Sequence, residues 1–190
     1  MEHKNSIWPA PTPRWWRPHL RLTRPILAGR RTTLISLGAF CLAVGTVAGW
    51  ASHHALCINS SESLPNWAFL VDTDRRSPLR GDYVSFSPGH DPLVVSHFGA
   101  RPPLFLKIAL GVAGDVVTHD GARVLINGRE VARMKPFSLR GEALVPGPVG
   151  KIPRGCIYAG SAFKDGFDSR YAEIGLVCRD RLAGVGEPIL

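Results

Sequence analysis

Three serines and one lysine are the residues of this 190-residue chain whose types point most directly to chemistry. Ser60, Ser61 and Ser63 lie in the stretch INSSESLPNWAFL at 58–70, which contains no histidine. The G-x-S-x-G turn that carries the nucleophile of α/β hydrolases is also absent from the sequence. A serine nucleophile here would therefore need another base, and a lysine that is neutral at the working pH can serve as one.

Lys107 is the best placed lysine for that role. It lies in the run FLKIAL at 105–110, where a strand period of two puts Phe105, Lys107 and Ala109 on one face. Apolar surroundings would lower its pKa from the usual value of about 10.4. Periodicity alone leaves a second interpretation open, because a lysine in a strand is more often an edge residue or one that extends its amine to water.

The remaining polar residues give no sign of a cofactor. Seven histidines are scattered without a cysteine or carboxylate at metal-ligand spacing. No Gly-rich phosphate loop precedes a helix, since GVAGD at 111–115 falls between predicted strands. We therefore predict neither a metal nor a cofactor.

A basic leader and an apolar run precede these residues. Most of the net charge of +8 comes from the Pro-rich residues 1–31, and residues 32–50 then carry no charge at all. A run of this length can cross a bilayer, whose core needs about 20 apolar residues of helix. The basic side lies before the run, so the N-terminus is expected in the cytoplasm and residues 51–190 outside it.

A cleaved signal peptide is the alternative interpretation of the same segment, although its apolar part is usually shorter. In both cases the domain at 51–190 is exported, and we expect it in a bacterial periplasm, at the inner membrane if the segment stays uncleaved. The basic leader lies beside anionic lipid, so we expect it to contact membrane lipid and not nucleic acid.

The exported part is expected to be mostly β. Short runs rich in Val, Ile, Leu and Phe predict the strands, and Asn127-Gly128 predicts a tight hairpin. The predicted strands cover 67–71, 82–86, 92–98, 103–110, 114–119, 123–126, 129–132, 155–160 and 174–179, and 135–155 is expected to be a long surface loop. The predicted fold is a twisted, partly closed β-barrel domain with one N-terminal transmembrane helix.

Four blocks in this order resemble the type I signal peptidase superfamily of Ser-Lys peptidases, and within it the conjugal-transfer peptidases called TraF. They are NSSESLP at 59–65, RGDYVSF at 80–86, LKIALGVAGDVV at 106–117 and FDSRYAEIGLV at 167–177. The resemblance covers about residues 32–178. It implies the signal-peptidase fold and a serine endopeptidase.

The resemblance also assigns roles to residues. It implies that Ser63 is the nucleophile and Lys107 the general base. Ser61, with the Ser63 backbone N–H, would hold the oxyanion. Supporting roles fall to Asn59, Asp168 and Arg170.

Some positions depart from the family pattern. Trp67 stands where glycine is usual, Ile108 where arginine is common and Ala113 where proline is common. Gly166 replaces the usual serine before F-D-S-R, and the spacing after D-S-R-Y is longer. These changes leave the nucleophile and the base in place, and Trp67 is expected to reshape the substrate groove.

The resemblance implies a substrate and partners. The substrate would be the secreted precursor of the conjugative pilus subunit, and the partners the other proteins of mating-pair formation and plasmid transfer. Hydrolysis and a cyclising acyl transfer both remain open. An extended substrate is expected to pair with a strand edge near 67–71. Two alternatives remain, a general type I signal peptidase and a non-catalytic periplasmic assembly protein.

The cysteines suggest one disulfide in the exported part. Around a 161–171 loop, the strand after D-S-R would run antiparallel to the strand of Cys156, which brings Cys178 near Cys156. An oxidising compartment permits the bridge. Two reduced, buried thiols remain the alternative.

Overall fold

The computed structural model describes residues 24–190, and the predicted leader therefore falls mostly outside the described residues. The chain divides into two units, which end and begin at Ala48 and Gly49. Each unit is described by itself below.

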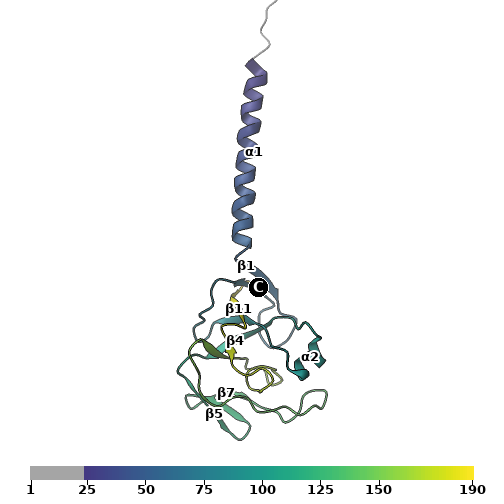
Figure 1. Cartoon of the computed structure of the whole chain (residues 1–190), viewed down its shortest axis with the longest axis vertical. Helices are drawn as coiled ribbons and strands as arrows, with labels where there is room; N and C mark the ends of the chain where they lie inside the picture. Colours follow the sequence, from purple (N-terminus) through teal and green to yellow (C-terminus); the bar gives the residue numbers. More distant parts are fainter. Residues whose placement is uncertain (1–23) are drawn as a thin grey trace, which may run out of the picture. The chain divides into compact units, whose positions relative to one another are not determined.

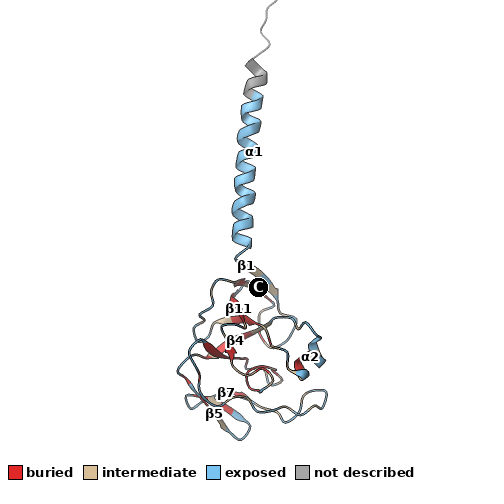
Figure 2. Ribbon diagram, in the orientation of Figure 1, coloured by how far each residue is buried: buried red, intermediate tan, exposed pale blue. Residues whose placement is uncertain are grey.

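The described residues of the first unit belong to a long helix, α1, whose bounds are Arg24–Ala51 and whose last three residues fall in the second unit (Figure 1). Its stretch Gly29–Ala51 has a mean hydropathy of 1.8, and all side chains of that stretch are exposed (Figure 2). At 1.5 Å per residue it is about 35 Å long, which is enough for a bilayer core of about 30 Å. A helix of this length and composition can cross a membrane, and a signal sequence near the N-terminus has the same properties.

The second unit is mostly β, as predicted, and contains two antiparallel sheets (Figure 1). The larger sheet has the strand order β1-β2-β11-β3-β4-β9-β10. Its strands are β1 (His54–Ile58), β2 (Ala68–Asp72), β3 (Tyr83–Phe86), β4 (Phe105–Gly111), β9 (Cys156–Gly160), β10 (Val177–Cys178) and β11 (Leu182–Pro188). β1 and β10 form its two ends, so the sheet does not close on itself.

The smaller sheet has the order β7-β6-β5-β8. Its strands are β5 (Val116–Asp120), β6 (Arg123–Ile126), β7 (Arg129–Arg133) and β8 (Gly150–Lys151). The predicted hairpin joins β6 to β7, and both of its central residues have positive φ, 51° at Asn127 and 80° at Gly128. Such a turn favours Asn-Gly because these residues tolerate the left-handed conformation.

Two apolar cores hold the second unit together. One core packs residues of β3, β4 and β9 around Phe86 and Ala109. The other joins the two sheets, since Tyr158 of the larger sheet packs with Val117 and Ile126 of the smaller one. Gly111 lies where the sheets meet, and a Cβ there would lie 2.8 Å from the Cδ1 atom of Ile152. Its lack of a side chain permits this close packing.

The prediction of a strand at 92–98 was wrong, because this run forms the short helix α2, Pro92–Phe98. The side chain of Asp91 caps the helix by accepting a hydrogen bond from Leu93 N at 2.8 Å. Pro92 occupies the first turn, where its missing N–H costs nothing. A short apolar run cannot distinguish strand from helix by its period, and this Asp-Pro start was the signal for a helix.

Three strands were not predicted, β1, β8 and β11. β11 lies in the middle of the larger sheet, between β2 and β3, although it contains Gly184 and Gly186. A Cβ on Gly184 would lie 2.7 Å from the Cγ1 atom of Val71. Glycine is therefore required there by the close approach of β2, which no local propensity reveals.

The expectation that substrate pairs with an edge near 67–71 was also wrong. β2 is hydrogen-bonded on both sides, to β1 and to β11. Neither edge of β2 is free to accept another strand.

Candidate active site

Ser63 lies in a tight loop between β1 and β2. The loop is closed at its base by a hydrogen bond from Asn59 N to Trp67 O of 2.8 Å. Leu64 is 5% exposed and anchors the loop in the interior, whereas Ser63 remains half-buried. We call residues 59–67 the nucleophile loop.

The side chain of Asn59 organises the inside of this loop. Its Nδ2 donates to the carbonyl oxygens of Leu64 at 3.2 Å and Asn66 at 3.1 Å. Its Oδ1 accepts from Ser61 twice, from the backbone N at 3.1 Å and from Oγ at 2.9 Å. One amide therefore satisfies polar groups on both sides of Ser63.

The hydroxyls of Ser61 and Ser63 lie 2.8 Å apart. Because Asn59 Oδ1 can only accept, Ser61 uses its single proton in the bond to Asn59. Ser63 is then the donor of the bond between the two hydroxyls. The proton that a base must remove from Ser63 is thus directed at Ser61 in this structure.

Lys107 lies on β4 and is 6% exposed, beside Ala109 on the buried face. Burial lowers the pKa of its amine below the usual 10.5, while the nearby Asp168 carboxylate raises the pKa and Arg170 lowers it. Among residues 24–190, no group forms a hydrogen bond or ion pair with the Lys107 amine. A buried lysine of this kind is suited to be a base, because its neutral form is favoured.

One cavity of about 310 Å³ brings Ser63, Ser61 and Lys107 together. Residues 103–107, which are the start of β4 and the two residues before it, also line the cavity. β9 pairs with β4 only from Ile108 onward, so the first part of β4 has one edge without a partner strand. No Ser63–Lys107 hydrogen bond occurs among the described residues, and such bonds are often longer before substrate binds.

Trp67 does not line this cavity and is 56% exposed. The predicted effect of Trp67 on the groove is therefore not seen in this structure. The turn that closes the nucleophile loop has room for a large side chain that points to solvent.

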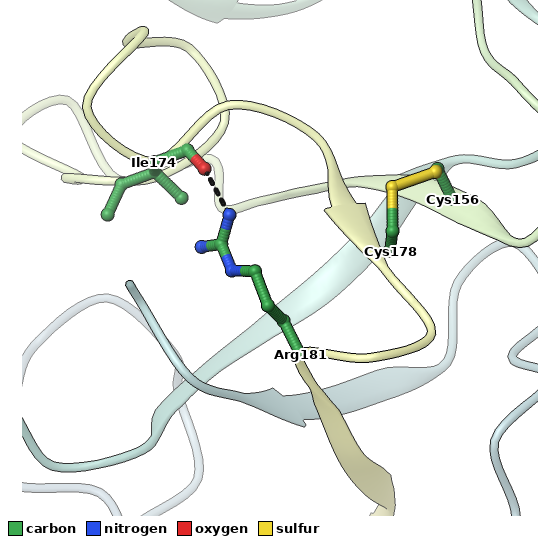
Figure 3. The surroundings of a disulfide bond; sticks show 4 residues. All are labelled: Cys156, Ile174, Cys178 and Arg181. Atoms are coloured by element: carbon green, nitrogen blue, oxygen red, sulfur yellow. Dashed lines mark hydrogen bonds between the residues drawn. A yellow bond between two sulfur atoms is a disulfide. The ribbon is translucent and has the colours of Figure 1, made fainter. Parts of the chain in front are cut away.

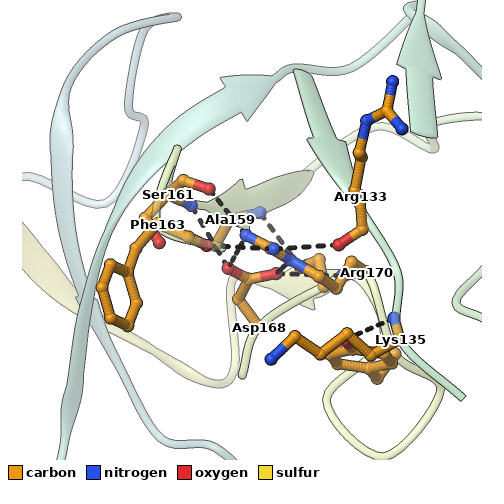
Figure 4. A network of polar contacts seen from close by, with 9 residues as sticks. Arg133, Lys135, Ala159, Ser161, Phe163, Asp168 and Arg170 are labelled. Carbon is orange, nitrogen blue, oxygen red and sulfur yellow. Dashed lines mark hydrogen bonds and ion pairs between the residues drawn. The ribbon is translucent and has the colours of Figure 1, made fainter. Parts of the chain in front are cut away.

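Asp168 and Arg170 form a buried pair, with exposures of 0% and 1%, and both influence the pKa of Lys107. Figure 4 shows the contacts between their side chains. Arg170 Nε donates to Asp168 Oδ1 at 2.8 Å and Nη2 donates to Oδ2 at 2.9 Å. Its other N–H groups donate to the carbonyls of Ser161, Phe163 and Arg133. All five guanidinium donors are thereby used, and the segment 161–171 is fixed onto β7.

Cys156 and Cys178 are joined by a disulfide between β9 and β10 (Figure 3). Arg181 supports the same region, since its Nη1 donates to Ile174 O at 2.8 Å and its Nε to Ser87 O at 3.0 Å. These links hold the chain that follows Arg170 against β9 and the end of β3.

One supporting pair was missed by the sequence analysis, Arg80 and Asp115. Arg80 donates to both carboxylate oxygens of Asp115 at 2.6 Å, and Asp115 also accepts from Val112 N and Asn127 Nδ2. Burial raises the Asp115 pKa, but these hydrogen bonds outweigh burial and hold the pKa below its usual value. Arg80 and Asp115 belong to two separate sequence blocks, at 80–86 and 106–117, and only the fold brings the two residues into contact.

A comparison with known proteins identifies the family of the chain. The family model described as signal peptidase, peptidase S26, matches residues 30–190. The chain belongs to this family.

The chain is also similar to two individual proteins. A conjugal transfer protein TraF from Agrobacterium fabrum is 26% identical over 167 residues, which are 82% of this chain and 92% of the relative. The crystal structure of a signal peptidase I from Enterococcus faecalis is 19% identical and covers 58% of this chain and 97% of its own, with a TM-score of 0.32. The recognition of a TraF-type member of the signal peptidase family is confirmed.

Proposed function

We propose that this chain is a membrane-bound serine endopeptidase that matures a secreted precursor during conjugal transfer, with Ser63 as nucleophile and Lys107 as general base. The substrate is the precursor of the conjugative pilus subunit, and the partners are the proteins of the transfer apparatus. Residues 1–31 form a cytoplasmic leader, 32–50 the membrane span and 51–190 the periplasmic catalytic domain.

The observation that carries this proposal is the shared cavity of Ser63 and Lys107. It combines a half-buried hydroxyl with a buried amine that has no partner among residues 24–190. The open edge of β4 at 103–107 lies along the same cavity, so an extended peptide can pair with it and bring its carbonyl to Ser63. Family membership and the conjugal transfer relative support the same assignment.

In the first half of the reaction, the neutral Lys107 amine takes the proton of the Ser63 hydroxyl as Oγ attacks the peptide carbonyl. The Ser61 hydroxyl, 2.8 Å from Ser63 Oγ, turns its proton from Asn59 Oδ1 to the oxyanion, and the Ser63 backbone N–H donates to the oxyanion as well. The Lys107 ammonium then gives its proton to the leaving amine. The peptide C–N bond breaks, and the acyl group stays on Ser63 as an ester.

In the second half, Lys107 activates the group that attacks this ester. Water as the attacking group releases a linear product, and an amine of the substrate itself releases a cyclic one. The Ser63–acyl bond breaks in both cases, and Lys107 returns the proton to Ser63 Oγ.

This mechanism fixes the sign of the pH dependence. Only the neutral lysine accepts the Ser63 proton, so the rate rises as the pH passes the pKa of Lys107. Burial lowers that pKa below 10.5, and the rise therefore occurs at a lower pH than for a free lysine.

Processing of the pilin precursor in conjugating cells tests the proposal. Cells carry the wild type, Ser63→Ala or Lys107→Ala, with Ser77→Ala and Lys151→Ala as matched controls at exposed positions outside the cavity. We expect processing to stop in the first two variants and to continue in both controls.

Other outcomes identify the alternatives. If transfer requires the chain but neither Ser63 nor Lys107, the chain is a non-catalytic assembly protein. If it rescues cells that lack their general signal peptidase, its substrate range is that of a housekeeping enzyme.

A further inference from the structure

Ser161 directly follows β9, and the role given to it below rests on the proposed function. Ser161 is 0% exposed, and its Oγ has no hydrogen-bond partner. Its backbone groups are both used, since N donates to Asp168 Oδ2 at 3.2 Å and O accepts from Arg170 Nη2 at 2.6 Å. A buried hydroxyl without a partner is uncommon in proteins and requires a reason.

The register of the sheet places this hydroxyl beside the lysine. β9 pairs with β4 through Ile108↔Gly160 and Ala109↔Ala159. Continuing the same antiparallel register by one residue puts Ser161 opposite Lys107. Directly opposed residues of antiparallel strands project from the same face and are close neighbours.

Gly166 gives an independent indication of where the hydroxyl points. A Cβ on Gly166 would lie 2.9 Å from Ser161 Oγ and 2.8 Å from Arg170 Nη2. Gly166 also lines the cavity that contains Lys107. The Ser161 hydroxyl therefore lies just behind the cavity wall formed by Gly166, where a larger residue would displace it.

We propose that Ser161 is a positioning residue, whose hydroxyl oxygen accepts a hydrogen bond from the Lys107 amine and directs the lone pair of that amine at Ser63. Both groups are buried and without a partner among the described residues, and a rotation of the flexible lysine side chain joins them. The glycine at 166 leaves space for this hydroxyl, which accounts for one departure from the family pattern.

The proposal predicts a specific change in the titration of Lys107. An oxygen that accepts a hydrogen bond from the ammonium favours its charged form, so Ser161→Ala lowers the pKa of Lys107 further. The maximal rate of Ser161→Ala should fall roughly 10–100-fold, the range for loss of a hydrogen bond to a charged group. The rise of the rate with pH should at the same time move to lower pH.

Ser85 provides the matched control. It is 1% exposed, and its Oγ is also without a hydrogen-bond partner. It lies on β3 opposite Leu106, which is one position from Lys107 and therefore on the other face of the sheet. Ser85→Ala thus removes a comparable buried hydroxyl without touching the lysine.

The experiment is an NMR titration of the Lys107 amine in the full chain in detergent, for the wild type, Ser161→Ala, Ser161→Thr and Ser85→Ala. We expect a lower pKa in Ser161→Ala only, with the wild-type value in Ser85→Ala and in Ser161→Thr, which keeps the hydroxyl. An unchanged pKa in a folded Ser161→Ala variant overturns the proposal.

This readout does not depend on activity. If Ser63→Ala processes precursor normally, the proposed function fails whatever the titration shows. If Ser63 is required but the pKa of Lys107 is the same in Ser161→Ala, only the positioning role of Ser161 fails.

Discussion

The nucleophile loop and the segment 161–171 supply polar groups around one cavity, but they are built in opposite ways. The loop keeps Ser61 exposed and is organised by a single amide, that of Asn59. The segment buries Asp168 and Arg170 completely and uses all five guanidinium donors. The reacting hydroxyl is thus accessible to a substrate, while the group beside the lysine is held rigidly.

This difference predicts which substitutions should lower stability and which should lower activity. Removing a partner from the buried segment leaves an uncompensated charge in the interior, which costs folding free energy. Removing a hydroxyl from the exposed loop costs little folding free energy but removes a contact to the reacting atoms. Four variants test this separation.

The largest expected effect is that of Arg170→Met. Asp168 then stays in the interior without its partner, and breaking a buried ion pair in this way typically destabilises a protein by about 3–5 kcal/mol. Denaturant unfolding of the full chain measures this loss. Arg133→Met is the control, because that exposed side chain forms only a surface pair with Glu130 and should cost less than about 1 kcal/mol. Equal losses in the two variants would contradict the structural role of Arg170.

The second effect is expected in the nucleophile loop. Ser61→Ala removes a hydroxyl proposed to hold the oxyanion, and such losses lower kcat roughly 10²–10³-fold. The unfolding midpoint should change little, because Ser61 is exposed. Processing kinetics and thermal unfolding of the same sample check both parts. A variant with full activity, or one that loses activity only by unfolding, would remove Ser61 from the mechanism.

The disulfide tests the outer support of the buried segment. Cys156 and Cys178 enclose a separation of 22 residues, and a loop of this size is worth about 3 kcal/mol. The double variant Cys156→Ser, Cys178→Ser should lose about this stability, as judged by denaturant midpoints with and without reductant. Reductant should lower the midpoint of the wild type and leave the double variant unchanged. A wild type indifferent to reductant would argue for two free thiols.

The smallest effect on folding stability is expected where the two regions meet, at Lys107. The pKa of Lys107 is lower in the folded chain than the usual 10.5, so folding releases a proton in the pH window between the two values. Wild-type stability therefore rises with pH through that window, because the unfolded state binds more protons. Below the pKa of Lys107 in the folded chain, the buried amine is charged, and the full cost of burying that charge lowers the free energy of unfolding.

Lys107→Met removes that cost and keeps a side chain of similar length. The variant should be inactive yet more stable than the wild type, most clearly at low pH, with the advantage shrinking as the pH approaches 10.5. Unfolding midpoints across this range measure the difference. Lys151→Met, at an exposed position, should show no such pH dependence. A Lys107→Met variant that is less stable than the wild type at every pH would contradict the claim that burial disfavours the charged form of Lys107.

Short sequence patterns predicted those parts of the fold that depend on neighbouring residues in the chain. Short runs rich in Val, Ile, Leu and Phe predicted β3 and β4, and Asn127-Gly128 predicted the hairpin of the smaller sheet. β11 was missed because the glycine at 184 is required by the close approach of the neighbouring strand β2, and not by the conformation of its own backbone. The helix α2 was missed because a short apolar run fits a strand and a helix equally well, and only the cap at Asp91 distinguishes them.

The functional site divides in the same way, into residues that the sequence predicted and residues that only the fold brings together. Resemblance to known blocks predicted Ser63 and Lys107, which the structure places on one cavity. The Arg80–Asp115 pair and the position of Ser161 opposite Lys107 depend on strands that are far apart in sequence. No spacing within one block contains that information.

The central claim is that Ser63 carries the acyl group during the reaction. The most direct test mixes the full chain with precursor, quenches the mixture rapidly and locates the covalent adduct by mass spectrometry. The account predicts an acyl ester on Ser63 in the wild type and none in Lys107→Ala. An acyl group on Ser60 or Ser61, or one that forms equally well without Lys107, would contradict it.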